Sequence, residues 1–306
     1  MQRYILVRLI QALLVLLFVS FIVFALARLT GNPVHIMLPA ESSKEDFDRI
    51  NAQLGFDRPL VVQYKLFLLN ALQGNLGQSV RFHRPALEVV LEYLPATISL
   101  GVIGFAIALC LAIPIGVYSA THRGTLLDKS SRGFAVVGQS MPTFASGIIL
   151  ILVFAVWLRL LPASGKGGIQ SYILPAITLG YYATAGIMRL TRSAMLDVLD
   201  SEYIKLARSK GLHERSVIWK HAFKNSLIPI LTFSTVVFVR IIVGSVVTET
   251  VFAWPGMGRL AVESIQYRDY PIVQTVVLIW CIMFGLGNLV TDILYAYVNP
   301  KIRYGK

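Results

Sequence analysis

The side chains that could do chemistry in this sequence gather in one basic segment, which runs from Leu199 to Pro229. Outside it, patterns typical of catalysis are missing. The five histidines are scattered, and the apolar segments hold no Ser-His-Asp cue and no pair of carboxylates for proton transfer. Residues 133–140 have the spacing of a phosphate-binding loop, but Gln139 stands where that loop needs lysine. We therefore expect no enzyme activity in this chain by itself, and no metal or cofactor site of its own.

The basic segment predicts two short amphipathic helices joined at Gly211. Asp200 or Ser201 can cap the first helix, because a side-chain oxygen there can accept from an unpaired amide of the first turn. One face of this helix is formed, at helical spacing, by Tyr203, Leu206, Ala207 and Lys210. Gly211 can adopt the left-handed conformation that ends a helix.

The second short helix carries Val217, Ile218 and His221 on a common stripe, and Pro229 marks the start of the next apolar segment. Two interpretations of this helical hairpin stay open. It can lie flat on anionic lipid headgroups, or it can dock into a groove of a cytoplasmic partner, as amphipathic helices do.

The rest of the chain is typical of a multi-span membrane protein, with 56% hydrophobic and only 14% charged residues. A span needs about 20 apolar residues. Six segments reach that length, and they are 9–28, 96–120, 134–158, 172–190, 226–248 and 273–298. The first is too long for the apolar part of a signal peptide, so a retained helix is favoured over a signal cleaved after Ala27.

The charge distribution predicts the orientation of these spans. With both termini in the cytoplasm, sixteen Lys and Arg residues lie on the cytoplasmic side and eleven on the other side, although the cytoplasmic segments are shorter. This asymmetry is the positive-inside rule, and it explains most of the net charge of +12 without nucleic acid. Cys110 and Cys281 lie in apolar segments and indicate neither a disulfide framework nor a metal site.

Two ionisable side chains, Arg240 and Asp292, fall inside apolar segments. Each costs about 3 kcal/mol at the centre of a bilayer and is expected to face protein or water. Asp292 can bond to neighbouring helices or reach the cytoplasmic interface. Arg240 can form a structural pair, line a polar pathway, or extend to the outer interface.

Two outer segments are also candidates for function. Residues 29–95 are too long for a simple connector, and residues 61–72 within them have the pattern of a short helix. A tight turn formed by Trp254, Pro255 and Gly256 separates the last two spans. This turn either reverses the chain or contacts a partner or gate on the outer face.

The motifs of the chain resemble those of one known family. The segments YIKLARSKG and HAFKNSLIP are similar to the EAA loop of ATP-binding-cassette (ABC) importers, in the form found in peptide and nickel permeases. The segments LPATISL, SMPTFASGI, ILPAITLG and ETVFAWPGMGRL follow in the order of that family, so the resemblance covers the whole chain. Lys205 departs from the general importer motif, which has glutamate there.

The resemblance implies an all-α membrane protein with the type I importer fold, in which six transmembrane helices leave both termini in the cytoplasm. It implies an N-terminal helix over 1–28, a periplasmic loop domain over 29–95, and a permease core over 96–306 that contains the coupling loop 191–225. The multi-pass chain would lie in the bacterial inner membrane. It would be the first of two homologous permeases of an importer for dipeptides, oligopeptides or nickel.

The implied partners are a second permease, two cytoplasmic ATP-binding subunits that hold the ATP and Mg, and an extracytoplasmic solute-binding protein. The coupling loop would contact the ATPase through Tyr203, Lys205, Leu206, Ala207, Arg208, Lys210 and Gly211. We expect transport of di- and oligopeptides. The alternatives are a nickel or metal-chelate importer and, in another class, a stand-alone channel or secondary carrier.

Overall fold

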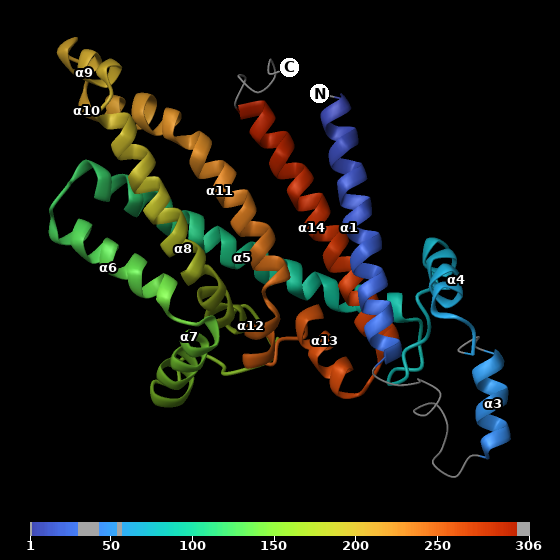
Figure 1. Ribbon diagram of the computed structural model, residues 1–306. Coiled ribbons are helices and arrows are strands. Elements are labelled where there is room, and N and C mark those ends of the chain that lie inside the picture. Colours follow the sequence, from blue (N-terminus) through green and yellow to red (C-terminus); the bar gives the residue numbers. More distant parts are fainter. Residues whose placement is uncertain (1, 30–42, 54–56, 299–306) are drawn as a thin grey trace. The chain divides into compact units, whose positions relative to one another are not determined.

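The computed structural model describes residues 2–29, 43–53 and 57–298, and in these ranges the regular secondary structure is helical apart from one isolated β-bridge between Gln78 and Pro85 (Figure 1). The all-α prediction is confirmed for this part of the chain. The longest helices are α1 (Gln2–Leu29), α5 (Ala86–Thr121), α8 (Gln170–Leu199), α11 (Lys224–Val243) and α14 (Tyr270–Val298). The shorter α-helices are α3 (Lys44–Gln53), α4 (Leu60–Leu72), α6 (Leu126–Ser140), α7 (Thr143–Leu150), α9 (Glu202–Ser209), α10 (Glu214–Ser216), α12 (Val246–Val251) and α13 (Met257–Gln266). Two π-helical segments are η1 (Ile151–Trp157) and η2 (Val217–Phe223).

The chain divides into two compact units. The first combines Met1–Thr97 with Pro255–Gly285, and the second combines Ile98–Trp254 with Leu286–Lys306. The functional domains that we expect from the sequence follow membrane topology, and their boundaries stay a prediction.

In the first unit, α5, α13 and α14 share a small apolar core. Val89 and Val90 of α5 are fully buried against Leu260 of α13 and Ile272 and Val276 of α14. The expected short helix over 61–72 is confirmed as α4. It packs on α1 through Tyr64, whose ring meets Phe21 and Phe24.

Polar contacts fasten the segment before α5 to the ends of α13 and α14. The Ser79 hydroxyl donates to the buried carboxylate of Asp269 (2.5 Å). The Arg81 guanidinium donates to the Glu263 carboxylate (2.7 Å), and this bond holds the pKa of Glu263 below its usual value. Glu263 therefore stays ionised at neutral pH and keeps its attraction to Arg81.

The second unit is built around α8, which packs against α6, α7, α11 and α12. Small residues allow close approach. A Cβ atom on Gly180 would lie 2.7 Å from the backbone oxygen of Gly104 in α5, which leaves no room for a side chain between the two helices. Ala183, Ala185 and Ile187 of α8 are fully buried as well.

We expect Gly180→Ala to destabilise the chain, although alanine normally favours a helix over glycine by about 1 kcal/mol. The added methyl group would push α8 away from α5, and overpacking of this kind costs roughly 1–3 kcal/mol. The matched control is Gly133→Ala in α6, where a Cβ atom would meet nothing within 4 Å. The melting temperature of the purified protein in detergent should fall for Gly180→Ala only. Equal melting of the two variants would contradict the close packing.

The structure supports fewer membrane spans than the six that the sequence predicts. Within the described part of the chain, four helices are long and apolar enough to cross a membrane, and the pair formed by 126–140 and 143–157 would make a fifth. The expected fourth span, 172–190, lies inside α8, which is not among these candidates. Gly180, Tyr182 and Gly186 dilute its apolar character, and much of this helix is buried against the rest of the unit. Six spans and two cytoplasmic termini stay a prediction.

The continuous span expected over 134–158 is wrong. The chain bends by 109° between α6 and α7. The bend follows from Pro142, which disfavours the helical conformation in the residue before it. Met141 is accordingly extended, with φ −86° and ψ 125°, and ends α6.

Candidate functional site

The first predicted short helix and the chain reversal at Gly211 are confirmed, whereas the second short helix is not separate, because α10, η2 and α11 run on as one helical segment over Glu214–Val243. Helix α9 ends at Ser209, and Gly211 takes the left-handed conformation with φ +74°. The Gly211 amide donates to the Arg208 carbonyl (2.9 Å) and the Leu212 amide to the Ala207 carbonyl (3.3 Å). These two bonds form the Schellman motif, which ends a helix and reverses the chain at a glycine. In Figure 1, α9 and α10 lie at the end of α8.

The hairpin is packed on the ends of α5 and α8 through an apolar cluster. Ile204 of α9 and Val217 and Ala222 of η2 are fully buried there. They pack against Met195 and Leu199 of α8. A hairpin anchored in this way can transmit force to the helices below it, whereas a hairpin that floated on lipid could not.

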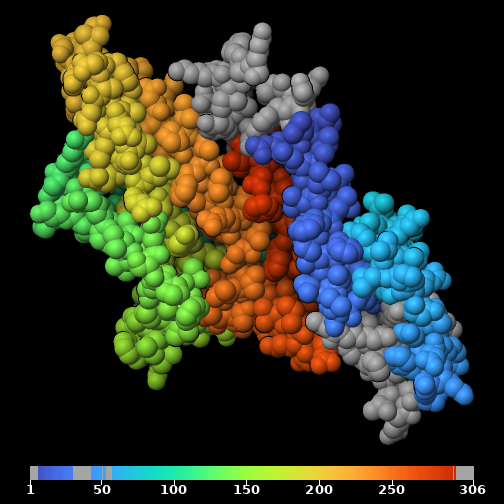
Figure 2. Space-filling model, in the orientation of Figure 1, coloured from blue at the N-terminus to red at the C-terminus, as the bar shows by residue number. Residues whose placement is uncertain are grey.

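Another side of the hairpin remains apolar and exposed. Tyr203 and Leu206 of α9 are 45% and 56% exposed. Leu212 in the turn and Trp219 of η2 are exposed as well. Figure 2 shows the hairpin, yellow to gold, as the tip of this unit. Large apolar side chains on an otherwise polar tip are typical of a binding surface.

The sequence prediction for the faces of the hairpin needs correction. Ala207 does not share the exposed face with Tyr203 and Leu206, because it packs beside Ile204 against the apolar cluster. Leu212 and Trp219 were missed. The sequence did contain an indication of them, because Leu212 and Trp219 are large apolar residues that fit neither of the predicted helical stripes.

The predicted cap of α9 and the predicted stripe of the second helix are also wrong in detail. Ser201 precedes α9, but its hydroxyl donates back to the Val198 carbonyl, and Asp200 ends α8. The buried stripe pairs Val217 with Ala222 instead of His221, because η2 is π-helical and brings residues five apart onto one face.

Ion pairs connect several of the predicted contact residues within the hairpin. Lys205 lies 2.8 Å from Glu202 of the same helix. Arg208 of α9 forms two bonds with Glu214 of α10 (2.7 and 3.2 Å), so that this pair spans the turn at Gly211. Lys210 is exposed at the end of α9.

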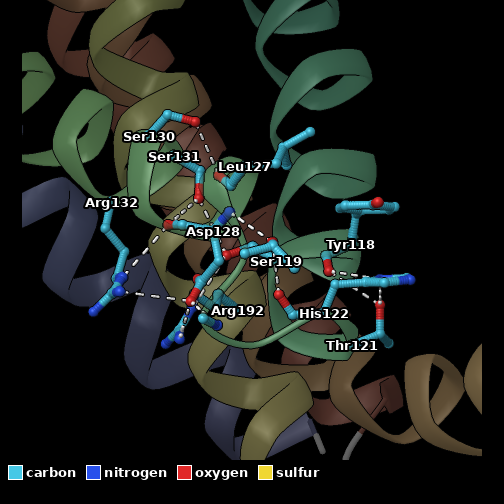
Figure 3. Close-up of polar contacts among 12 residues, drawn as sticks. Tyr118, Ser119, Thr121, His122, Leu127, Asp128, Ser130, Ser131, Arg132 and Arg192 are labelled. Carbon is cyan, nitrogen blue, oxygen red and sulfur yellow. Dashed lines mark hydrogen bonds and ion pairs between the residues drawn. The ribbon is translucent and has the colours of Figure 1, made fainter.

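The sequence did not point to a buried carboxylate, Asp128, whose polar contacts with neighbouring helices are drawn in Figure 3. Asp128 of α6 is 1% exposed and accepts from the Ser119 hydroxyl of α5 (2.5 Å) and from the Arg192 Nε of α8 (2.8 Å). The Gly124 amide of the α5–α6 turn donates to its other oxygen (3.0 Å). Asp128 therefore joins three helices. The available signal was an acidic residue three positions after Thr125, which caps α6.

The same turn contacts the base of the hairpin. Arg123 forms an ion pair with Asp200 at the end of α8 (2.9 Å). The Asp128 cluster, the α5–α6 turn and the hairpin are thus connected through charged contacts. Movement of the hairpin would be passed directly to α5, α6 and α8.

The turn at Trp254 is tightly packed. The Trp254 side chain is fully buried, meets the Tyr172 ring edge to face (4.5 Å between centroids), and lies under the Lys166 ammonium. The buried ring supports the role of the turn in chain reversal. Gly256 precedes α13, and a partner or gate contact of Trp254, Pro255 and Gly256 stays a prediction.

The structure tests the prediction for only one of the two ionisable residues in the apolar segments. Asp292 belongs to α14, and its side chain lies outside the described part of the structure. Arg240, in the last turn of α11, lines a cavity of about 240 Å³ together with Gln139 and Tyr182. Among the described residues, none forms a hydrogen bond or ion pair with its side chain. Of the three expected roles, this placement favours the lining of a polar pathway.

Comparisons with known proteins agree with the resemblance. The family model of the binding-protein-dependent transport system inner membrane component matches residues 112–304, and the model of its N-terminal part matches residues 1–101. The glutathione transport system permease protein GsiC of Escherichia coli strain K12 is 38% identical over 305 residues, which cover 99% of this chain and all of that protein. GsiC of Salmonella paratyphi A has the same identity and coverage.

Solved structures show the same fold at low sequence identity. An inward-facing form of the MetNI methionine ABC transporter has a TM-score of 0.59 at 16% identity, and it covers 69% of this chain and 96% of the other. An amino acid ABC transporter has a TM-score of 0.56 at 14% identity, with 69% and 94% coverage. The helical architecture around α8 is thus that of ABC transporter permeases. With both family models and full-length relatives in agreement, the chain belongs to the binding-protein-dependent transport system inner membrane components, as a non-catalytic, multi-pass permease subunit of a bacterial ABC importer.

Proposed function

We propose that this chain forms one half of the translocation pathway for di- and oligopeptides that a periplasmic binding protein delivers. The observation that carries the proposal is the 38% identity to a glutathione permease along nearly the entire chain, because glutathione is itself a tripeptide. The exposed apolar residues at the tip of the anchored hairpin support a cytoplasmic partner.

In the proposed mechanism, a second homologous permease completes the pathway, and two ATP-binding subunits supply the energy through ATP and Mg. The hairpin docks in a groove of one ATPase. Nucleotide binding closes the ATPases, which move the hairpins, and the spans rock from an inward-facing to an outward-facing state. The binding protein then releases the peptide, and hydrolysis resets the states.

The test is uptake of labelled peptide by proteoliposomes that contain both permeases and both ATPases, with the loaded binding protein outside. Uptake should require ATP and every subunit, and the chain alone should carry nothing. Solute movement through the chain alone would support the channel or carrier alternative and contradict the proposal. A nickel–histidine complex offered to the same vesicles tests the metal-chelate alternative.

We expect Leu206→Glu to weaken the contact between hairpin and ATPase. A buried interface anchor contributes roughly 2 kcal/mol or more, so ATPase association should weaken by about 30-fold. The matched control is Leu126→Glu, because Leu126 at the start of α6 is 85% exposed and lies outside the hairpin. Co-purification of the ATPase with each variant measures the effect. An undiminished yield with Leu206→Glu would contradict docking through this face.

A further inference from the structure

Two cavities lie along α8 in the second unit, the first between α8, α11 and the break from α6 to α7, and the second between α6 and α8. The first, called here the Arg240 cavity, holds about 240 Å³ and is lined by Gln139, Tyr182 and Arg240 among others. The second, called the Arg189 cavity, holds about 330 Å³ and is lined by Arg132, Arg189 and Arg192 among others. Among the described residues that line either cavity, none is acidic.

The two cavities lie along a single face of α8. Tyr182 and Gly186 line the first, and Arg189 and Ser193 line the second. Their intervals of four, three and four residues place them in one helical stripe. Seven residues separate Tyr182 from Arg189, which corresponds to about 10 Å along a helix. The two cavities therefore follow one another along α8 in the direction of the hairpin.

The lining of the two cavities, contributed by α6, α8 and α11, is strongly cationic. The Arg240 side chain has no hydrogen-bond or ion-pair partner among the described residues, and Arg189 has none either. Arg192 and Arg132 share one carboxylate, that of Asp128. Unpaired guanidinium groups on a face of this kind need an anion or water beside them.

The break between α6 and α7 gives an independent reason to place water here. Gln139, near the end of α6, and Thr143, at the start of α7, both line the Arg240 cavity, so the bend at Pro142 lies at its wall. Interrupted helices are tolerated at membrane depth where they are covered by protein or line a water-filled cavity. Such breaks commonly mark solute sites in transporters.

We propose that this arginine-lined face selects and conducts anionic solutes, namely small peptides with acidic side chains. The proposal rests on the peptide-transport function and names its substrate class. A guanidinium group binds a carboxylate through two parallel hydrogen bonds, and it stays charged at every physiological pH. An extended tripeptide is about 10 Å long. This length matches the rise along α8 between Tyr182, which lines the Arg240 cavity, and Arg189, which lines the other.

The first test needs no substrate. In a full importer whose Cys110 and Cys281 are replaced by alanine, Gln139→Cys is labelled with an anionic and with a cationic methanethiosulfonate. The quantity compared is the rate of labelling by the anionic reagent divided by the rate of labelling by the cationic reagent. We expect this ratio to be at least five-fold higher for Gln139→Cys than for a free thiol in solution. Arg240→Gln should remove this preference, whereas Lys129→Gln, an exposed charge on α6 outside both cavities, should keep it.

The second test measures uptake of Ala-Glu-Ala and Ala-Gln-Ala by the complete importer. The same binding protein delivers both peptides, so its own preference cancels when each variant is compared with the wild type. Arg240→Gln should lower uptake of Ala-Glu-Ala about ten-fold and change uptake of Ala-Gln-Ala less than two-fold. Arg240→Lys, which keeps the charge, should retain most uptake of the acidic peptide.

The outcomes separate this inference from the proposed function. If neither reagent labels Gln139→Cys, the cavity is closed by lipid or protein and the inference is wrong. If Arg240→Gln leaves the labelling ratio unchanged, or lowers the uptake of both peptides equally, it is wrong as well. If charge-dependent labelling is found but the wild type transports neither peptide, the inference of an anion-selective pathway is supported and the proposed function in peptide transport is contradicted.

Discussion

Gly211→Pro is expected to abolish ATP-driven uptake while the chain still inserts in the membrane at its normal level. Proline fixes φ near −65°, whereas Gly211 has φ +74° and donates its amide to Arg208. The turn must therefore open, and the Arg208–Glu214 pair that spans it is lost. A local cost of about 3 kcal/mol for the docked conformation corresponds to a loss of roughly 100-fold in coupled transport.

The control for this variant is Gly211→Asn. A Cβ atom on Gly211 would meet nothing within 4 Å, so only the backbone conformation limits the substitution. Asparagine tolerates the left-handed conformation better than other residues with a side chain, and transport should fall only a few-fold. Membrane abundance, basal ATPase activity and peptide uptake are measured together. Normal uptake by Gly211→Pro would contradict a role of the hairpin in coupling ATP hydrolysis to transport.

Asp128→Ala should destabilise the second unit by about 3–5 kcal/mol, the usual cost of removing one partner of a buried ion pair. The substitution leaves Arg192, which is mostly buried, without its carboxylate, and it frees the Ser119 hydroxyl and the Gly124 amide. The helices α5, α6 and α8 lose their common contact. A lower melting temperature and reduced yield of the purified importer are the expected readouts.

Asp197→Ala is the matched control, because Asp197 is an exposed carboxylate on α8. It should leave the melting temperature nearly unchanged. Adding Arg192→Met to Asp128→Ala should restore part of the lost stability, because the double variant no longer contains an unpaired charge. A melting temperature for Asp128→Ala equal to that of Asp197→Ala would show that the cluster contributes little.

Much of this architecture could be predicted because its signals are local. The apolar segments located the long helices, although α5 begins about ten residues before the expected segment 96–120 and α8 ends about nine residues after the expected segment 172–190. The glycine at 211 predicted the reversal of the hairpin. The pattern over 61–72 gave α4 in the same way. Each of these depends on periodicity or on the conformational preference of one residue type, which a sequence displays directly.

The missed features depend on contacts between distant segments. Asp128 is one carboxylate among the charges of a short loop, and only the approach of Ser119 and Arg192 shows that it is buried. Ile204 turned inward because α9 lies against the end of α8, which no helical period specifies. The π-helical turns of η2 shift a stripe by one residue, and the bend at Pro142 divides an apolar run that is otherwise continuous.

A nascent chain that has emerged only as far as α8 presents a helix too polar to remain in lipid by itself, since glycines, tyrosines and threonines interrupt its apolar residues. Its partners α5 and α6 are synthesised earlier and can shelter it, but α11 comes later. Biosynthesis of this chain therefore has a vulnerable interval, between the completion of α8 and the arrival of α11. Truncation within that interval should release α8 from the bilayer and expose the chain to membrane proteases.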